Sequence, residues 1–592
     1  MDILIVGAST GGVAAALAAS EVGAAVLLVE EGSWPGGQLT SQGVCTPDEN
    51  NWIEGMGCTE RYAAFRQEIR SWYTSTYSLS DTASLAHFNP GSCWVSRLSF
   101  EPQVGVDVLT AMMQPFIDSS KLKVIYHARV LSCEMRDRSL ESVEIETESG
   151  RFRVTARYTL DATDTGALLP LCGSEDVDWV VGAESREVTG EPDAPPSARK
   201  DWVQPFTFPF AIEWSPETIS TNRISAPPFY AELKAKQNYH ILHGAITGIF
   251  QGAMPWWAYR RILASSNFAD ARIPADVAMI NTAGNDYYGG NIIGSLAKDD
   301  HSVQTTLQRA REASLGYLYW LQNECERETP AKDGSTKGYP EFRLRSDLFG
   351  TVDGCSPQPY IRESRRIVPV ARILEQQIVV KDFSGATCRG ESARASFMAD
   401  SIGIGHYALD IHPNGHGEPN HYVPTQPFQI PLGALIPNHL ECYLPACKNL
   451  GTTHLTNGAY RLHPIEWNVG ESAGLLAAWC VKHGLTPREV LHNQNTLRKF
   501  QLHLVRQGVP VYWFEDVMRD DPAFEAVQIL AVMGVPIAHD NDLLFRANDE
   551  IPAVEWRAWL NSVQVNYFEF TGTRSEAARK LWAIICTDLE QS

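Results

Sequence analysis

The chain has 592 residues, 44% of them hydrophobic, and carries 49 basic against 70 acidic residues, for a net charge of −21. That length predicts two or three structural units rather than one core. The acidic balance argues against nucleic acid and anionic membrane as general partners, because both attract basic surfaces. No apolar run is long enough to cross a bilayer, so we expect no membrane insertion. The first apolar run begins almost at Met1 and leaves no room for a signal peptide, so we expect a cytoplasmic protein.

The cysteines and histidines indicate no metal centre. The 12 cysteines are scattered and form no C-x-x-C pair, which in a cytoplasmic chain is typical of buried thiols. Four histidines gather in residues 405–422, but no helical H-x-x-x-H pair with a matching acid accompanies them. We therefore expect no metal site and interpret most of these histidines as loop or surface residues.

The chain opens with a strand, a glycine turn, a helix and a second strand. The apolar runs Ile3–Val6 and Val26–Val29 suit buried parallel strands, and the alanine-rich residues 13–20 between them suit a helix. The second strand ends at Glu30. This is the layout of the dinucleotide-binding fingerprint, in which the helix N-terminus holds a pyrophosphate and the acid binds a ribose.

One position of the fingerprint departs from G-x-G-x-x-G, because Ser9 stands where the second glycine is usual. A serine crowds the point where the backbone approaches the ligand, although its hydroxyl can itself bind a phosphate. Glu31 is the alternative ribose ligand. A packing turn with a chance acid is the competing interpretation. The predicted contacts in this segment are Gly7, Ser9, Gly11, Gly12 and Glu30.

The residues that follow point to a flavin nucleotide. Residues 30–43 read EEGSWPGGQLTSQG, with a Gly-Gly pair just after the acid. This stretch resembles the second FAD segment of the glutathione-reductase-like flavoproteins. More narrowly, it is similar to FAD-dependent oxidoreductases with a G-G-Q-x-T-S-x-G loop, cousins of the fumarate reductase and succinate dehydrogenase flavoproteins. The resemblance implies FAD contacts at Gly36, Gly37, Gln38 and Thr40. An NAD-binding enzyme without flavin is a weaker alternative.

Four later segments carry the same resemblance, in the same order as in the family. They are HARV at 127–130, YTLDATDTGALLPLCG at 158–173, PYIRESRRIV at 359–368 and LGTTHLTNGAYRLHPIEWNVGESAGLLAAWC at 450–480. The resemblance implies further FAD contacts at Val130, Asp161, Thr163, Gly166, Glu466 and Asn468. The likeness is patchy over residues 176–430.

The last of these segments predicts a helix by its own pattern. Pro464 suits a first helical turn, and residues 465–480 have helical spacing. Gly470, Ala473 and Gly474 leave one side of that helix nearly bare. Close packing alone explains the bare side; the resemblance favours a helix whose N-terminus points at the pyrimidine edge of the flavin.

The attachment of the cofactor is expected to be non-covalent. Relatives of the succinate dehydrogenase type link FAD to a histidine, and no histidine occurs between Met1 and Ser41. Cys45 lies close by and is the alternative attachment point, although a buried free thiol is the simpler interpretation. No second complete glycine fingerprint occurs, so a built-in NAD(P)H domain is not expected.

We predict an α/β fold: a Rossmann-like FAD-binding domain of the GR2 type with an inserted α+β substrate domain and a helical C-terminal appendage. The predicted segments are 1–175 and 431–485 for the FAD-binding domain, 176–430 for the substrate domain and 486–592 for the appendage. In the inserted domain Trp256, Trp257 and Tyr259 are interpreted as ordinary core or as the wall of a pocket over the flavin. The appendage either braces the FAD domain or forms a contact in a homo-oligomer.

The expected chemistry follows from the cofactor, since bound FAD supplies hydride or electron transfer. Arginine holds a carboxylate with two hydrogen bonds, and histidine moves protons near neutral pH. The predicted catalytic residues are Arg362, Arg365, His454 and His463, with Arg461 as a further candidate. For the arginines the competing interpretation is a structural ion pair, for example with Glu363. For the histidines it is a hydrogen-bonded loop residue.

The predicted function is an FAD-dependent dehydrogenase or reductase that moves a hydride between flavin N5 and a small organic substrate. Two alternatives remain open. One is a flavin monooxygenase or an oxidase that uses O₂. The other is an electron-relay flavoprotein subunit without a substrate of its own. The substrate is not predicted, because it would bind to the part of the chain with the least family likeness, and a fold does not determine a function.

Overall fold

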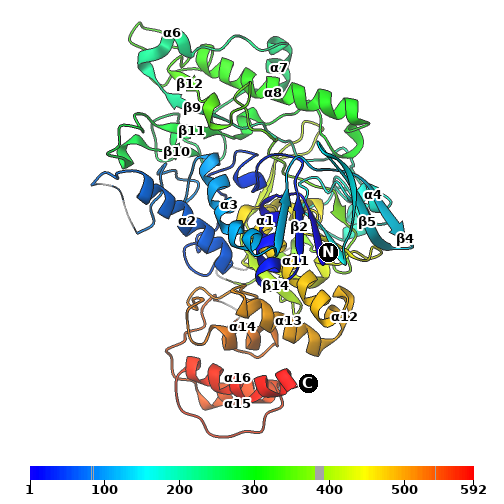
Figure 1. The fold of residues 1–592 in the computed structure, drawn as a ribbon. Helices are drawn as coiled ribbons and strands as arrows, with labels where there is room; N and C mark the ends of the chain where they lie inside the picture. Colours follow the sequence, from blue (N-terminus) through cyan, green and yellow to red (C-terminus); the bar gives the residue numbers. More distant parts are fainter. Residues whose placement is uncertain (82, 84–85, 381–392, 540–541, 592) are drawn as a thin grey trace.

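The centre of the molecule is a five-stranded parallel sheet (Figure 1). The computed structural model describes residues 1–592 except 82, 84–85, 381–392, 540–541 and 592. The strand order is β18 (Tyr443–Pro445), β7 (Tyr158–Asp161), β1 (Ile3–Val6), β2 (Val26–Val29) and β3 (Leu122–Ile125). Val6 lies opposite both Val29 and Asp161. The parallel strands therefore end together at one edge, where a nucleotide site is expected.

Two helices packed against each other join the ends of this unit. Helix α1 (Thr10–Glu21) begins at the predicted turn, and α11 (His463–His483) has Pro464 in its first turn, as expected. A Cβ added to Gly470 would lie 2.0 Å from the carbonyl oxygen of Gly11, and one added to Gly474 would lie 2.4 Å from that of Ala15. The bare side of α11 is therefore the surface on which α1 packs.

Further elements flank the sheet. Helices α2 (Glu60–Thr76) and α3 (Pro102–Asp118) lie on one side, and an antiparallel meander of β4 (Arg129–Arg136), β5 (Ser139–Thr147) and β6 (Gly150–Thr155) lies on the other (Figure 1). The parallel sheet with its covering helices confirms the predicted α/β, Rossmann-like class.

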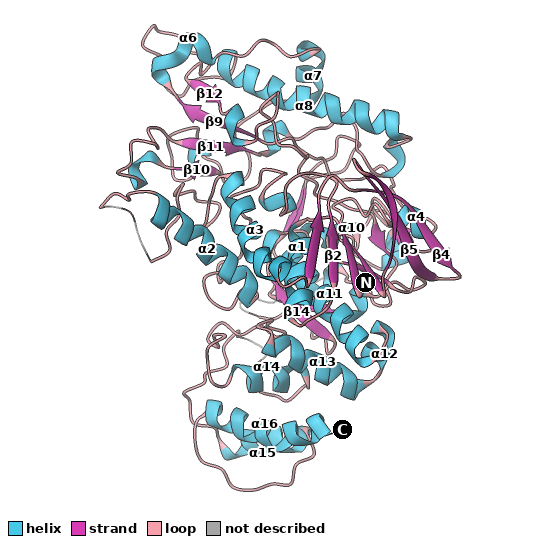
Figure 2. Cartoon of the chain, in the orientation of Figure 1, coloured by secondary structure: helices cyan, strands magenta, loops and turns pink. Residues whose placement is uncertain are grey.

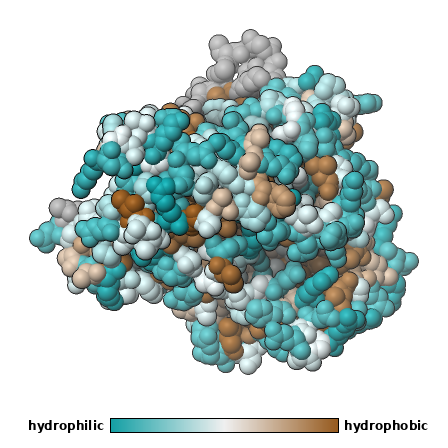
Figure 3. All heavy atoms as spheres, turned by 90° about the horizontal axis from the view of Figure 1, so that it is seen from above, coloured by the Kyte–Doolittle hydropathy of each residue, from teal (hydrophilic) through white to brown (hydrophobic). Residues whose placement is uncertain are grey.

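A second, antiparallel sheet forms a cap over the carboxyl edge of the first. Its order is β10 (Arg261–Leu263), β11 (Val277–Ile280), β9 (Phe210–Trp214) and β12 (Phe342–Leu344), and helices α7 (Tyr230–Gln237) and α8 (Asp300–Asn323) cover it (Figure 2). The cap has an aromatic core of its own, in which Trp257 stacks on Phe342 with ring centroids 5.4 Å apart. The face seen from above is mostly hydrophilic, with small separate hydrophobic groups (Figure 3).

Short elements link cap and sheet. The paired strands are β8 (Trp179–Val180) with β13 (Arg366–Ile367), β14 (Ser401–Gly405) with β17 (Phe428–Pro431), and β15 (Leu409–Ile411) with β16 (His421–Val423). The short helices are α4 (Leu169–Cys172), α5 (Arg186–Thr189), α6 (Ile219–Asn222), α9 (Glu375–Ile378) and α10 (His454–Tyr460).

The C-terminal region is helical, as predicted. Its helices are α12 (Pro487–His492), α13 (Gln494–Arg506), α14 (Phe524–Val532), α15 (Ala553–Ser562) and α16 (Arg574–Gln591), and they extend away from α11 (Figure 1). A capping box begins α12, since Thr486 accepts from the Glu489 N–H at 3.2 Å and Glu489 accepts from the Thr486 N–H at 2.7 Å. Among the described residues, no helix combines the length and the apolar character that a bilayer span requires.

The α1–α11 contact predicts that Gly470→Ala destabilises the protein by about 3 kcal/mol, because the added methyl group meets backbone that cannot move aside. Denaturant unfolding measures the effect as a lower midpoint with unchanged slope. Lys482→Ala, at an exposed position of the same helix, is the control. Equal midpoints for the two variants would contradict the close approach of the helices.

Candidate functional site

A cavity of about 520 Å³ opens at the carboxyl edge of the parallel sheet. It extends from Val130 and Leu131 past the ends of β1, β2 and β7 to Gln42 and Ile361. The residues predicted to bind the cofactor that line it are Gly7, Ser9, Glu30, Gly37, Val130 and Thr163, together with the alternative Glu31. Residues from separate segments of the chain, between Gly7 and Thr163, therefore line one elongated cavity.

The middle of this cavity is built to hold an anion. Within the described part of the chain, four backbone N–H groups make no hydrogen bond there, those of Ser9, Thr10, Gly37 and Gln38. The two segments touch, since a Cβ on Gly37 would lie 2.9 Å from Cα of Ser9. The Gly36 N–H donates to the Ala8 carbonyl oxygen at 2.7 Å and fixes their spacing. Free N–H groups at a helix N-terminus and an adjoining glycine loop suit a pyrophosphate.

Ser9 occupies its position without the crowding expected from the sequence. Its φ of −60° is ordinary for any residue, so a glycine is not required there. Its hydroxyl accepts from the Gly12 N–H at 3.2 Å and caps α1, which gives the side chain a structural role. The backbone N–H of Ser9 makes no hydrogen bond among the described residues and is available to a ligand.

Glu30 lies at the end of β2, where the fingerprint requires an acid. Its carboxylate accepts from the Ala8 N–H at 2.6 Å, the Gly32 N–H at 2.7 Å and Gln358 Nε2 at 3.2 Å. Burial raises the pKa of Glu30, and the two backbone donors oppose that rise. Glu31 is exposed. The buried, oriented carboxylate of Glu30 is therefore the better placed ribose ligand.

Several predicted contacts support the cavity from behind instead of lining it. A Cβ on Gly12 would lie 2.0 Å from the Gly7 carbonyl oxygen, and one on Gly11 would lie 2.0 Å from that of Ala446. Asp161 accepts from the Thr163 N–H at 3.0 Å and from Tyr443 Oη at 3.0 Å, which holds the turn after β7. Others with structural contacts are Gly36, Thr40 (to the Pro35 carbonyl oxygen), Gly166 (φ +61°) and Asn468 (accepting from the Ile404 N–H).

Glu466 belongs to a buried ion cluster between α1 and α11. Its carboxylate accepts from the Gly11 N–H at 3.2 Å, Gln38 Nε2 at 2.8 Å and Lys448 Nζ at 2.8 Å. Lys448 also pairs with Asp164, so its one ammonium contacts both the Glu466 and the Asp164 carboxylates. Gln38 Oε1 is buried without a partner among the described residues. One acceptor therefore remains for a ligand.

Beyond Ile361, the cavity meets a buried cluster of paired charges. The Ile361 N–H donates to Gln42 Oε1 at 3.2 Å, and the neighbouring Tyr360 accepts through Oη from Arg461 Nη1 at 2.9 Å. Arg461 Nη2 donates to the Asp410 carbonyl oxygen at 3.1 Å. Arg461 Nε has no partner among the described residues, although the side chain is 2% exposed.

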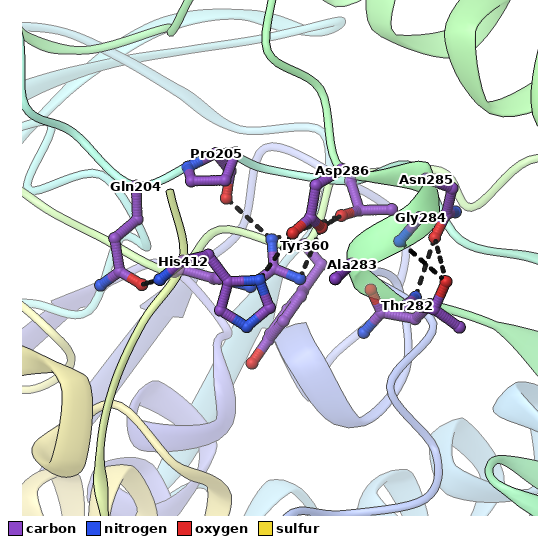
Figure 4. A network of polar contacts seen from close by, with 12 residues as sticks. Gln204, Pro205, Thr282, Ala283, Gly284, Asn285, Asp286, Tyr360 and His412 are labelled. Carbon is purple, nitrogen blue, oxygen red and sulfur yellow. Dashed lines mark hydrogen bonds and ion pairs between the residues drawn. The ribbon is translucent and has the colours of Figure 1, made fainter. Parts of the chain in front are cut away.

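His412 contacts the Asp286 carboxylate in this cluster (Figure 4), and Arg362 pairs with the same carboxylate. Asp286 lies 2.6 Å from His412 Nδ1 and 2.8 Å from Arg362 Nη2. Burial acts to raise the pKa of Asp286, but the charges of Arg362 and His412 outweigh it and hold the pKa at about 2. Burial and Arg362 act to lower the pKa of His412, yet the charges of Asp410 and Asp286 raise it overall. Asp286 is therefore a permanent anion around which the cluster is organised.

His463 lies at the start of α11 with one ring nitrogen free. Its Nδ1 accepts from the Asp48 N–H at 3.0 Å, and Nε2 is buried without a partner among the described residues. Burial lowers the pKa of His463 to about 3, so the ring is neutral and carries its proton on Nε2. Asp48 pairs with Arg260 at 2.9 Å. His463 therefore offers a hydrogen-bond donor and not a base.

The other two predicted catalytic residues lie elsewhere. Arg365 lines the nucleotide cavity and donates to the Thr165 carbonyl oxygen at 3.0 Å. His454 is held between Glu363 at 3.0 Å and Glu418 at 2.5 Å. Burial acts to lower the pKa of His454, but the two carboxylates raise it well above its usual value. Both ring nitrogens are engaged, so its geometry is that of a structural ion pair.

Most residues of the buried charge cluster beyond Ile361 are not predicted from the sequence. The residues not selected are Asp48, Arg260, Asp286, Tyr360, Asp410 and His412. His412 corrects the interpretation of the 405–422 histidines, because it lies in a loop but its side chain is only 19% exposed and ion-paired. Of the three cap aromatics, only Tyr259 contacts the cluster, through Arg260. Most of these residues lie in loops or turns and Asp410 lies in the three-residue strand β15, so periodicity carries no signal for them.

The ion pairs of His454 predict a pH-dependent loss of stability on substitution. Because its folded pKa is raised, the stabilising contribution is full below the unfolded value near 6.5 and is lost as pH rises through the folded pKa. His454→Gln should cost about 3 kcal/mol below pH 6.5 and less at alkaline pH, measured by denaturant unfolding. His492→Gln, at an exposed position, is the control. A difference that does not vary with pH would contradict this account.

Comparisons with known proteins agree with this geometry. The model of the family described as FAD dependent oxidoreductase matches residues 2–504. No match to a curated protein is found.

Among solved structures, the chain is similar to three that serve as examples. Sdh1 of Mycobacterium smegmatis in complex with UQ1 is 14% identical over 28% of this chain and 34% of that chain, with a TM-score of 0.19. The p-nitrophenol 4-monooxygenase PnpA of Pseudomonas putida DLL-E4 is 9% identical over 63% and 69%, with a TM-score of 0.28. The glycerol-3-phosphate dehydrogenase of Bacillus halodurans complexed with FAD is 10% identical over 28% and 34%, with a TM-score of 0.17.

The matched part spans about a third of the Mycobacterium and Bacillus chains. At these identities and TM-scores, none of the three indicates which reaction this chain catalyses. The family model matches most of the chain: the protein belongs to the FAD dependent oxidoreductase family, an enzyme family whose cofactor is FAD.

Proposed function

We propose that the protein is an FAD-dependent dehydrogenase that moves a hydride between FAD and a small organic substrate bound beneath the cap. One observation carries the proposal. The far end of the nucleotide cavity, at Gln42 and Ile361, leads by direct hydrogen bonds through Tyr360 to the buried cluster around Arg461. A buried polar cluster beside the redox cofactor supplies what hydride transfer needs, namely orientation of the substrate and movement of a proton.

The chain's own groups fit FAD along the whole cavity. The free N–H groups of Ser9, Thr10, Gly37 and Gln38 would hold the pyrophosphate, and Glu30 the ribose. Val130 would lie at the adenine end. Gln38 Oε1 and His463 Nε2 are an acceptor and a donor that have no partner among the residues the structure describes, which suits the pyrimidine edge of a flavin. When bound, FAD supplies hydride transfer at N5.

Arg461 is the residue proposed to orient the substrate. Two of its nitrogens are fixed by Tyr360 and Asp410, which leaves the Nε–H as a rigid donor. Burial of a guanidinium with an unused donor is costly unless a ligand accepts from it. The substrate domain, predicted as residues 176–430, would cover the Arg461 guanidinium and exclude water from it.

The proposed FAD link is non-covalent. Residues 1–41 contain no histidine, and Cys45 is fully buried in the core beside the sheet. Burial raises the pKa of the Cys45 thiol, so it remains protonated and a poor nucleophile. Neither attachment chemistry is therefore available near the Gly36–Gly37 loop.

The proposal is tested by spectra of the purified protein. We expect flavin absorption that passes into the supernatant after acid precipitation, and loss of that absorption when the substrate is added without O₂. Slow return of the absorption in air distinguishes a dehydrogenase from an oxidase, which would release peroxide rapidly. A C4a-peroxyflavin would instead indicate a monooxygenase. Loss of absorption only with a protein partner would indicate an electron-relay subunit.

The anion site predicts opposite outcomes at two neighbouring positions. Gly37→Ala should weaken FAD binding at least about tenfold, because φ of +51° disfavours a side chain and the methyl group meets Ser9. Ser9→Ala should retain FAD affinity and lose about 1 kcal/mol of stability, the usual cost of removing an N-cap. Titration of the apoprotein with FAD and denaturant unfolding measure the two effects. Weak FAD binding by Ser9→Ala would show that the hydroxyl contacts the phosphate.

A further inference from the structure

We infer that His412, oriented by Asp286, is the catalytic residue that removes the hydroxyl proton of an alcohol substrate during its oxidation. The inference rests on the proposed function and narrows it to one residue and one substrate class. Sequence analysis had placed His412 among loop or surface histidines.

The local structure fixes the imidazole on its Nδ1 side (Figure 4). Asp286 Oδ2 lies 2.6 Å from His412 Nδ1, and the other oxygen of Asp286 accepts from Thr207 Oγ1 at 2.6 Å and pairs with Arg362. The His412 N–H donates to Gln204 Oε1 at 3.3 Å, which anchors the backbone. A buried carboxylate on Nδ1 keeps the proton there and leaves Nε2 as the basic nitrogen, the arrangement used in general-base catalysis.

The Asp286 side of the dyad is itself held in place. The short turn Ala283–Asn285 precedes Asp286, and Asn285 Oδ1 accepts from the Thr282 N–H at 2.8 Å (Figure 4). The Asp286 side chain is 0% exposed. The carboxylate is therefore preorganised by its loop and not by the histidine alone.

The Nε2 side of the His412 ring is held less tightly than the Nδ1 side. The side chains of His412 and Asp410 are 19% and 24% exposed, whereas those of Arg362 and Arg461 are 3% and 2% exposed. Asp410 lies 3.4 Å from Nε2, longer than the usual N–H···O distance of about 2.9 Å. Asp410 also contacts Arg461, which reaches Tyr360 beside the cavity. Nε2 is therefore the ring nitrogen with the weaker partner, and it is the one that a substrate would have to reach.

The charges around His412 favour a hydroxyl over an ammonium substrate. The groups that face it are Asp286, Asp410, Arg362 and His243. Burial lowers the pKa of His243 to about 4, so that ring is neutral. Across the wider cluster, Arg260, Arg362 and Arg461 match Asp48, Asp286 and Asp410 in number. When His412 takes a proton, the net charge of the cluster becomes positive. A positive cluster repels a cationic substrate but does not repel a neutral alcohol.

The step balances as a two-electron oxidation. The O–H proton moves to His412 Nε2, the O–H bonding pair forms the second C–O bond, and the C–H pair leaves with its hydrogen as hydride to FAD. The imidazolium that results lies between Asp286 and Asp410, which stabilise it. The alcohol is oxidised to a carbonyl compound, and the proton later passes to water through the exposed edge of Asp410.

The first test measures the dyad without catalysis. We expect NMR of the ¹⁵N-histidine-labelled holoprotein to show a His412 pKa above its usual 6.5, because Asp410 and Asp286 favour the charged ring. Asp410→Asn should lower that pKa, and Asp286→Asn should lower it and weaken the Nδ1 proton preference. Asp410→Asn keeps the evidence usable if Asp286→Asn does not fold. An unchanged His412 pKa in Asp410→Asn would overturn the arrangement.

The second test measures proton removal with a panel of small primary and secondary alcohols under anaerobic conditions. The rate of flavin reduction should rise with pH through the His412 pKa found by NMR, because the neutral ring is the base. Asp410→Asn should move that rise to lower pH. His412→Asn, which retains a donor toward Asp286, should lower the rate about 10²- to 10⁴-fold without changing the flavin spectrum. His301→Asn, exposed on α8, is the control.

Three outcomes would overturn the inference. A full rate in His412→Asn together with a lost rate in His243→Asn would move the base to the other histidine. Flavin reduction by amines or acids but by no alcohol would exclude the substrate class and leave the dehydrogenase proposal standing. If no small molecule reduces the flavin, both the role of His412 and the dehydrogenase proposal are wrong.

Discussion

The structure depends on the contact between α1 and α11, two helices joined at small residues from opposite ends of the chain. A Cβ on Gly470 would meet the carbonyl oxygen of Gly11, and one on Gly11 would meet that of Ala446, so neither position tolerates a side chain. The same contact brings Glu466 to the Gly11 N–H, and with it Gln38 and Lys448. The first turn of α11 then positions His463 and, just before it, Arg461. Cofactor cavity and charge cluster are thus aligned by backbone packing that leaves no freedom for relative movement.

Most of the buried charges at the site occur in closed pairs. Arg260 with Asp48 and Arg362 with Asp286 are such pairs, and His454 lies between Glu363 and Glu418. Such pairs contribute little net stability, because desolvation offsets their attraction, yet breaking one is costly. Arg461 Nε and His463 Nε2 are among the buried atoms that have no partner within the described residues, and they are the two proposed here to meet a ligand.

The strand, turn and helix of the cofactor domain could be predicted because local physics determines them. Ile3–Val6 and Val26–Val29 are strands with the predicted bounds, and the bare side of α11 follows from its glycines. The charge cluster could not be predicted, because its members come from separate segments of the chain; Asp286 and His412, for example, are 126 residues apart. A motif-based resemblance also favoured His454, whose partner Glu418 is 36 residues away and has no motif.

The wide separation of α1 and α11 in the sequence has a consequence for biosynthesis. Helix α1 is buried along almost its whole length, yet its partner α11 begins more than 440 residues later. On the ribosome, the N-terminal unit emerges with this small-residue face uncovered and cannot complete the cofactor site. At synthesis rates of about 5–20 residues per second, that exposure lasts for tens of seconds. Newly made chains should therefore need chaperone protection until α11 arrives, and FAD should bind only after nearly the whole chain has been translated.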